Sequence, residues 1–279
     1  MGYVLFDIDV DTIKVGVSQD LQKLDNVIAI ATPQKYNDGI KKILEAVDTL
    51  KVANVRAIAV GVRGILNGEK TEIAHDTVLS DWIDKPIYQK LKKEIGAEVY
   101  MENNASLAGL GEAVYGAGAG NEIVVYHTIG SGVGGAKIED GFIDDYHTGF
   151  EPGRQILDID HTILGDEVEP TLENLISASA VEKRMGMKPE TIPQDDAIWD
   201  QLALYLAHGL RNSILYWSPD VIVLGGTMIE GDPHIEINNI VKHTNTVLGE
   251  VAETPLILKA SLGEQSTLYG AMALLNQKV

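Results

Sequence analysis

Hydrophobic residues recur along this chain in two patterns, one typical of amphipathic helices and the other of buried strands. In residues 38–50 they lie three and four positions apart, which predicts a helix with one apolar face. Residues 55–62 form an unbroken apolar run, as expected for a strand whose sheet is covered on both faces. Strands and helices of these two kinds alternate along the chain, and this alternation predicts an α/β protein.

The same patterns place elements along the whole chain. Strands are expected at residues 2–9, 12–18, 27–31, 55–62, 97–101, 123–128, 135–139, 221–224 and 256–260. Helices are expected at residues 38–50, 85–95, 105–115, 172–183, 198–217, 237–248 and 266–276. Residues 149–160 are expected to form a loop and a strand. In each half of the chain, paired hairpin strands precede strand–helix units.

Polar and glycine-rich stretches follow two of the predicted strands in the middle of the chain. The cluster Glu102-Asn103-Asn104-Ala105 follows the strand at 97–101, and the glycine run 130–135 follows the strand at 123–128. A Gly/Ala-rich hinge at 116–120 separates them. Ligands of open α/β sheets bind at the carboxyl ends of strands, and glycine-rich turns let backbone N–H groups approach phosphate. We therefore expect a two-part site in a cleft between two lobes.

The glycine run differs from a dinucleotide-binding fingerprint. Such a fingerprint must open a helix, whereas residues 130–135 lead into the alternating strand pattern of 135–139. The run is therefore predicted to be a hairpin. By itself this pattern is consistent with a phosphate-binding hairpin and with a merely flexible one.

Composition and charge exclude several function classes. No run of 18 apolar residues occurs, and the N-terminus is a strand pattern without a signal sequence, so we expect a cytoplasmic protein with no membrane partner. The formal net charge of −19, without a basic stripe, argues against nucleic acid binding and indicates either a solubilising surface or a surface kept for one partner. The chain has no cysteine, and its seven histidines lack ligand spacing, so we expect them at the surface or at helix caps.

Several spaced motifs, in this order, resemble the ROK family of repressors, open reading frames and sugar kinases, which belongs to the actin-like ATPase superfamily. They are Asp7-Ile8, Glu102-Asn103-Asn104-Ala105 with Gly111-Glu112-Ala113, the run 130–135, Glu151-Pro152-Gly153, Glu173, and the segment 218–226. The resemblance implies a two-lobed actin-like ATPase (ribonuclease H-like) α/β fold, in which each lobe is a mixed sheet flanked by helices. It also implies lobes of residues 1–117 with 265–279 and of residues 118–264.

The resemblance further implies the residues of a site for a small-molecule sugar and for ATP with magnesium. The expected sugar-binding residues are Gly64, Asn103, Glu151, Arg154 and Glu173, and Asn104 stands at the position of the family's catalytic Asp. The expected nucleotide-binding residues are Asp7, Asp9, Thr128, Gly130, Ser131, Gly132, Gly134, Gly225 and Gly226. Of these, Asp7 is expected to interact with the magnesium indirectly. The family's cysteine-rich zinc loop is missing after Gly165, so no zinc is expected. Dimers are common in the family, and a homodimer is one expected assembly.

The chain departs from the family pattern at three places. The family's E-N-D-A reads Glu102-Asn103-Asn104-Ala105 here, and an amide cannot accept the proton of an attacking hydroxyl. The family's first phosphate loop, D-x-G-G-T-K, is replaced by residues 7–12, where Asp9 and Asp11 would either repel a triphosphate or recruit magnesium. Arg154 replaces a family histidine and would either bind an anionic ligand or pair with Glu151 or Asp158.

Three functions are consistent with these residues. The first is an ATP-dependent kinase for the 6-hydroxyl of a hexose or N-acetylhexosamine, weakened or inactivated by Asn104. The second is a non-catalytic sugar- or partner-binding protein on a degenerate kinase fold. The third is a sugar-responsive repressor, which would require a DNA-binding segment before the first strand, where Asp7 already lies.

Overall fold

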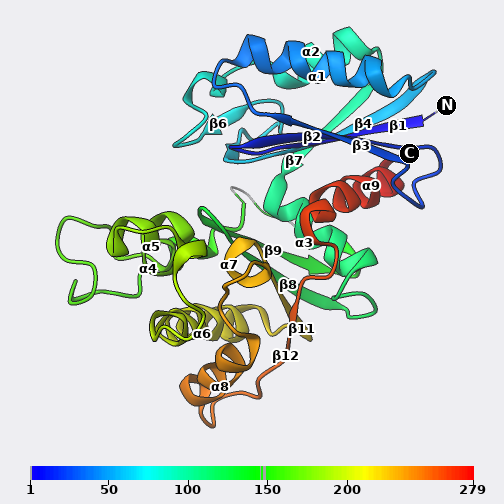
Figure 1. The fold of residues 1–279 in the computed structure, drawn as a ribbon. Coiled ribbons are helices and arrows are strands. Elements are labelled where there is room, and N and C mark those ends of the chain that lie inside the picture. Colours follow the sequence, from blue (N-terminus) through cyan, green and yellow to red (C-terminus); the bar gives the residue numbers. More distant parts are fainter. Residues whose placement is uncertain (1, 145, 147–148) are drawn as a thin grey trace. The chain divides into compact units, whose positions relative to one another are not determined.

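The structure is a computed structural model that describes residues 2–144, 146 and 149–279. The chain forms two compact units, each with its own sheet (Figure 1). Unit 1 comprises Met1–Val114, Asp145–Gly149 and Glu264–Val279, and unit 2 comprises Tyr115–Asp144 and Phe150–Gly263. The lobes implied by the family resemblance are residues 1–117 with 265–279 and residues 118–264.

Unit 1 contains a mixed five-stranded sheet with helices on both faces (Figure 1). Its strands are β1 (Gly2–Ile8), β2 (Thr12–Ser18), β3 (Asn26–Ala31), β4 (Val55–Val62) and β7 (Glu98–Asn103), in the order β3-β2-β1-β4-β7. Helices α1 (Tyr36–Leu50) and α2 (Ile87–Ile95) cover one face, and α3 (Asn104–Tyr115) and α9 (Ser266–Lys278) lie on the other. A two-stranded sheet of β5 (Ile65–Leu66) and β6 (Ile73–His75) and a 3-10 turn at Ser80–Trp82 complete the unit.

Three strands of unit 1 run parallel and end at the same edge of the sheet. Ile8 of β1 pairs with Val62 of β4, and Val62 pairs in turn with Asn103 of β7. The residues that follow these three are Asp9, Arg63 and Asn104. The register therefore brings residues far apart in sequence to adjacent strand ends, which we call the unit 1 edge.

Two glycines of unit 1, Gly270 and the motif residue Gly111, are explained by the crossing of α3 and α9. A Cβ atom on Gly270 would lie 1.7 Å from the carbonyl oxygen of Leu107, and one on Gly111 would lie 2.4 Å from that of Ser266. Side chains at these positions would force the two helices apart. Gly111 of the family motif is therefore a packing residue.

Unit 2 contains a second mixed sheet and a helical core. Its strands are β8 (Ile123–Ile129), β9 (Val133–Glu139), β10 (Phe142–Ile143), β11 (Val221–Gly225) and β12 (Leu256–Lys259), in the order β10-β9-β8-β11-β12. Its helices are α4 (Leu172–Ile176), α5 (Ala178–Met185), α6 (Ile198–Trp217), α7 (Thr227–Glu230) and α8 (Ile237–Leu248). Two 3-10 turns lie at Pro152–Arg154 and Pro189–Thr191, and a third, Gly263–Gln265, lies where the chain returns to unit 1.

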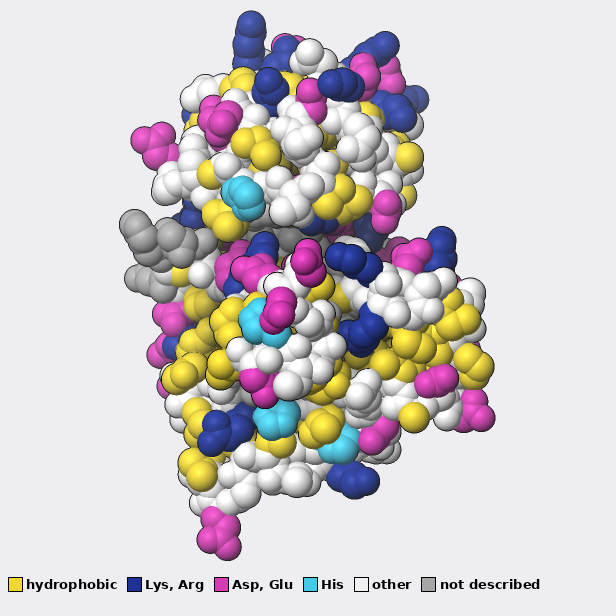
Figure 2. Space-filling model, turned by 90° about the vertical axis from the view of Figure 1, so that its left-hand side faces the viewer, with side chains coloured by type: hydrophobic (Ala, Val, Ile, Leu, Met, Phe, Trp, Pro, Cys, Tyr) yellow, Lys and Arg dark blue, Asp and Glu magenta, His cyan; other side chains and the backbone are white. Residues whose placement is uncertain are grey.

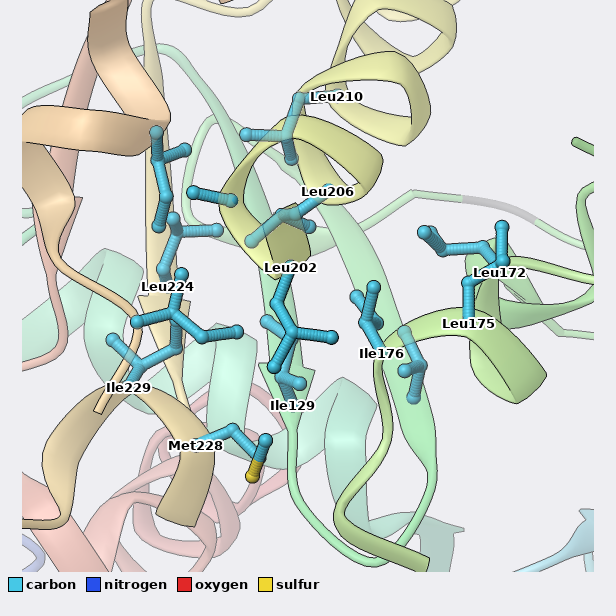
Figure 3. Packing of buried hydrophobic residues seen from close by; sticks show 14 of the residues in the cluster. Ile129, Leu172, Leu175, Ile176, Leu202, Leu206, Leu210, Leu224, Met228 and Ile229 are labelled. Atoms are coloured by element: carbon cyan, nitrogen blue, oxygen red, sulfur yellow. The ribbon is translucent and has the colours of Figure 1, made fainter. Parts of the chain in front are cut away.

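Helix α6 supplies much of the core of unit 2. Leu202, Leu206 and Leu210 lie four residues apart on one face of this helix, and all three are fully buried. They pack against residues of the sheet such as Ile129 and Leu224 (Figure 3). The four-residue spacing that predicted this helix thus corresponds to its buried face.

Most predicted elements agree with the structure to within a few residues, and two predictions were wrong. The helix expected at 172–183 is two helices, because Ser177 begins a new one by accepting the backbone N–H of Ala180 at 3.2 Å. A serine side chain that bonds a nearby backbone N–H favours such a helix start. The strand expected in 149–160 is a 3-10 turn at Pro152–Arg154 and an isolated bridge between Ile156 and Thr171.

The exterior agrees with the charge pattern of the sequence. Figure 2 shows basic and acidic side chains interspersed over the layer of α1 and α2. Lys90 of α2 pairs with Glu94 at 3.0 Å, and Lys92 pairs with Glu98 at 2.8 Å. These exposed lysines form a solvated face, as expected. Among the described residues, no helix combines the length and the hydropathy that crossing a bilayer requires.

One histidine lies where the sequence did not place it. His127 of β8 is fully buried, and its Nε2 lies 3.0 Å from the hydroxyl of Ser213 on α6. Its Nδ1 has no hydrogen-bond partner among the described residues. Burial lowers the pKa of His127 to about 4. The expectation of surface or capped histidines was therefore wrong for this residue.

This burial predicts an acid sensitivity of unit 2. An unfolded chain binds a proton at histidine near pH ~6.5, whereas the buried ring resists protonation until about pH 4, so His127 should lower the free energy of unfolding by about 2 kcal/mol between pH 7 and pH 5. His127→Gln should remove this contribution, and urea unfolding at the two pH values measures it. Ser213→Ala, which keeps the ring, should retain the sensitivity. An unchanged pH dependence in His127→Gln would contradict the assignment.

Candidate functional site

Asp7 of β1 is the buried carboxylate of the unit 1 edge. Its exposed fraction is 6%, its side chain is hydrogen-bonded to Thr267, and its Oδ1 has no partner among the described residues. Burial, and then the charge of Asp9, raise the pKa of Asp7 to about 7, although Lys14 opposes the shift. A buried oxygen without a partner fits a donor brought by a ligand, such as a water bound to magnesium.

Asp9 and Arg63 form a charged pair at the ends of β1 and β4. Arg63 donates its Nε to Asp76 at 2.7 Å, and its Nη1 lies 3.7 Å from Oδ1 of Asp9. Asp9 is half exposed, and the same Oδ1 accepts the backbone N–H of Val10 at 2.7 Å. The positive charge of Arg63 therefore offsets part of the negative charge that Asp9 adds to the first loop. No group of three or more His, Asp or Glu side chains suited to a metal ion occurs within the described ranges.

Asn103, the last residue of β7, hydrogen-bonds to the backbone at the start of α3 and to the backbone of Gly64. Its Oδ1 accepts the N–H groups of Ala105 at 2.9 Å and Ser106 at 3.2 Å, which makes it the cap of α3. Its Nδ2 donates to the carbonyl oxygen of Gly64 at 3.0 Å. Gly64 has a φ of +86°, and a Cβ there would lie 2.6 Å from the carbonyl oxygen of His75. Asn103 thus fixes the shape of the edge, a role that the sequence did not reveal.

Asn104 is the first residue of α3 and is partly exposed at the unit 1 edge. Its side chain makes no hydrogen bond to any other residue that the structure describes. A carboxamide at this point can donate and accept hydrogen bonds, but it remains neutral and unprotonated near neutral pH. The geometry thus leaves Asn104 accessible to a ligand without giving it a basic group.

A buried ionic cluster precedes these two asparagines, and the sequence analysis did not find it. Glu102 is 3% exposed and accepts hydrogen bonds from Lys70 Nζ at 2.5 Å, from the hydroxyl of Tyr146 and from the N–H of Asn103 at 2.8 Å. Lys70 also lies 4.3 Å from the ring centroid of Tyr146. Burial, and then the charge of Glu102, raise the pKa of Tyr146. No local pattern could have revealed this cluster, because its members lie 32 and 44 residues from Glu102.

In unit 2 the glycine run is the hairpin between β8 and β9, as predicted. Ile129 pairs with Val133 across it, and the N–H of Gly130 donates to the carbonyl oxygen of Gly132 at 2.9 Å. Ser131 is exposed at the tip, and Gly134 lies in β9 opposite Thr128. Glu173 reaches this hairpin from α4, because its Oε2 accepts the N–H of Val133 at 2.8 Å.

The turn Gly225-Gly226 lies beside this hairpin at the end of β11. Thr128 of β8 pairs with Gly225. Gly226 has a φ of +89°, and a Cβ there would lie 2.4 Å from the carbonyl oxygen of Ile129, so only glycine fits. The N–H of Gly226 donates to Oε2 of Glu230 at 2.7 Å. Within unit 2, Thr128, the hairpin and the turn therefore meet at neighbouring strand ends.

Glu151 precedes the 3-10 turn Pro152–Arg154, and Arg154 is its last residue. The carbonyl oxygen of Glu151 accepts the N–H of Arg154 at 3.0 Å. Arg154 pairs with Glu169 at 3.7 Å, an acidic partner that the sequence analysis did not consider. Asp158 is instead buried and accepts the N–H groups of Ile163 and Leu164. Arg154 is about half exposed, with a side-chain exposed fraction of 48%.

Comparison with known proteins decides the family. The sequence matches the family described as "ROK family" over residues 3–278. The chain belongs to the ROK family. It is 28% identical over 211 residues to a fructokinase of Lactococcus lactis subsp. cremoris, a match that covers 72% of this chain and 70% of that protein.

Solved structures agree with this result. The ROK hexokinase of Thermus thermophilus superposes with a TM-score of 0.83 at 25% identity and covers 100% of this chain and 99% of its own. A ROK family glucokinase of Streptomyces griseus, solved with glucose and AMPPNP, gives a TM-score of 0.83 at 24% identity and covers 99% and 100%. The predicted fold class, a two-lobed actin-like α/β protein with a mixed sheet in each lobe, is confirmed.

The environment of Asp7 predicts how this ROK protein's stability varies with pH. A carboxyl whose pKa is about 7 when folded, but ~3.8 when unfolded, stabilises the fold at acid pH and loses that contribution as the pH rises through 7. The expected loss between pH 5 and pH 8 is about 2–3 kcal/mol. Asp7→Asn should remove this dependence in urea unfolding. Asp166→Asn, at an exposed position, is the control, and equal pH profiles for Asp7→Asn and wild type would contradict the prediction.

Proposed function

We propose that this ROK protein binds a hexose or N-acetylhexosamine and transfers phosphate to it from magnesium-ATP slowly or not at all. Relatives of this chain include fructokinases and glucokinases, which supports a neutral sugar as ligand. In this proposal Asn103, Gly64, Glu151 and Glu173 hold the sugar, and the hairpin 130–134 with Gly225 and Gly226 holds the nucleotide. Magnesium-ATP is a substrate here, with Asp7 facing the water shell of the metal.

The observation that carries the proposal is Asn104 at the position of the catalytic base. A sugar hydroxyl that attacks the γ-phosphorus must lose its proton, and a positioned carboxylate contributes typically ~10²–10⁴-fold to such a step. Asn104 can orient the hydroxyl through hydrogen bonds, but it cannot hold the proton. Positioning and electrostatics carry most of phosphoryl transfer, so residual turnover is compatible with this loss.

The nucleotide side has changes of its own. Asp9 adds a carboxylate to the first loop, and Arg63 offsets part of its charge from a distance of 3.7 Å. Glu230 places a second carboxylate on the N–H of Gly226, at a turn that is expected to bind the nucleotide. Negative charges near a triphosphate weaken its binding unless cations compensate. These features favour weak nucleotide binding.

A second candidate is a non-catalytic protein on the same fold. Arg154 favours it, because this half-exposed cation stands where kinases of the family have a histidine, and its ion pair with Glu169 is long, at 3.7 Å. A guanidinium binds carboxylate or phosphate well. A protein of this kind would bind an anionic sugar and would not bind ATP.

Turnover distinguishes the two candidates. We expect ADP release, measured with a coupled assay over hexoses and N-acetylhexosamines, to fall well below the ~1–100 s⁻¹ typical of kinases. Asn104→Asp should raise it by up to ~10²–10⁴-fold, because it supplies a base. Asn26→Asp, an amide-to-acid change at an exposed strand position, should leave it unchanged. Wild-type turnover in the usual kinase range would contradict the proposal, and no gain in Asn104→Asp together with no ATP binding would favour the second candidate.

The first loop gives a separate prediction for nucleotide affinity. Asp9→Asn removes the negative charge but keeps an oxygen that can accept the N–H of Val10. We expect magnesium-AMPPNP to bind a few-fold to ~10-fold more tightly to this variant, measured by calorimetry. Asp140→Asn, at an exposed turn, serves as the control. Weaker binding in Asp9→Asn would instead indicate that Asp9 recruits the magnesium.

A further inference from the structure

Glu173 has one carboxylate oxygen in use and one available. Oε2 accepts the N–H of Val133 in the glycine hairpin at 2.8 Å. Oε1 makes no hydrogen bond to any residue within the described part of the chain. The side chain is partly exposed, so a ligand can reach it. A carboxylate accepts bonds at both oxygens, and Glu173 can therefore contact the hairpin and a ligand at the same time.

The hairpin fits closely against this carboxylate. A Cβ atom on Gly132 would lie 2.7 Å from Oε2 of Glu173, a separation that real Cβ contacts do not show. The atom that this Cβ would meet is the end of a flexible side chain, so the carboxylate of Glu173 is the group that would move. A side chain at 132 would displace the carboxylate or distort the hairpin.

A second contact ties the same helices to the hairpin. The N–H of Ala178, the first residue of α5, donates to the carbonyl oxygen of Gly130 at 2.7 Å. Residues on either side of the break at Ser177 therefore hold the hairpin at Gly130 and at Val133. A shift of the corner between α4 and α5 must move both ends of the hairpin tip.

We infer that Glu173 couples the sugar subsite to the phosphate hairpin, with one oxygen on the sugar and the other on Val133. The inference rests on the proposed function, in which Glu173 binds a sugar hydroxyl. A sugar on Oε1 restrains the carboxylate and thereby orders the hairpin before a nucleotide arrives. Coupling between two sites is reciprocal. A group on the hairpin that displaces the carboxylate of Glu173 should therefore lower the affinity for the sugar.

Hydrogen exchange of the peptide that spans residues 129–135 tests the hold on the hairpin without any ligand. Glu173→Ala should accelerate exchange there by about 10-fold, because Val133 loses its acceptor. Glu173→Gln should preserve slow exchange, since its amide oxygen can replace Oε2. Fast exchange in wild type and in both variants alike would overturn the inference.

Sugar binding to the full chain, measured by calorimetry without nucleotide, tests the coupling. The probes are D-glucose, D-fructose, D-mannose and N-acetylglucosamine. Gly132→Ala should weaken the best of them by about 10-fold or more although it lies in the phosphate hairpin, because its Cβ displaces Glu173. Gly68→Ala, where a Cβ would meet nothing within 4 Å, is the matched control and should bind normally.

The outcomes separate the inference from the proposed function. If wild type binds a sugar and Gly132→Ala binds it equally well, the coupling is overturned while the proposed function stands. If wild type binds none of the probes, the proposed function fails and the coupling fails with it. Weakened binding in Gly132→Ala, together with slower exchange of 129–135 when the sugar is added to wild type, supports the inference.

Discussion

The parallel pairing of β1, β4 and β7 is the constraint on which the unit 1 edge depends. Because Ile8, Val62 and Asn103 share one register, the next residues Asp9, Arg63 and Asn104 must lie at neighbouring strand ends. A shift of one residue would turn their side chains to the opposite face of the sheet. The buried apolar faces of these strands fix the register, so the core determines where the polar groups lie.

Hydrogen bonds then fix the shape of this edge more tightly than the sheet alone. Asn103 caps α3 and donates a hydrogen bond to the backbone of Gly64. The neighbouring Glu102 accepts hydrogen bonds from Lys70 and Tyr146. Truncating one partner of such a buried network costs more than a surface contact, because the remaining group is left desolvated. The unit 1 edge is therefore held in one shape by these hydrogen bonds, and Asn104, the site of the proposed loss of a catalytic base, lies directly beside them. In unit 2, the contact of Glu173 with Val133 gives the glycine hairpin a comparable restraint.

The sequence predicted those parts of the molecule that depend on local pattern. Helix α6 and strand β4 have the predicted bounds, because continuous or periodic apolar residues decide them. The break at Ser177 was missed because a single cap bond overrides the helical pattern around it. Long-range contacts left no local signal: neither the pairing of Arg63 with Asp76 nor that of Arg154 with Glu169 could be read from spacing. The family motifs supplied the predicted site residues, and the structure added that Asn103 and Glu173 hydrogen-bond to neighbouring backbone.

In the proposed function, the chemical step fails at Asn104 while the sugar still binds. A single-turnover quench-flow experiment, with enzyme in excess over radiolabelled ATP and with saturating sugar, isolates that step from product release. The account predicts transfer to the sugar that is slower than in Asn104→Asp by at least ~10²-fold, at equal sugar affinity. Equal rates of transfer in the two proteins would contradict it.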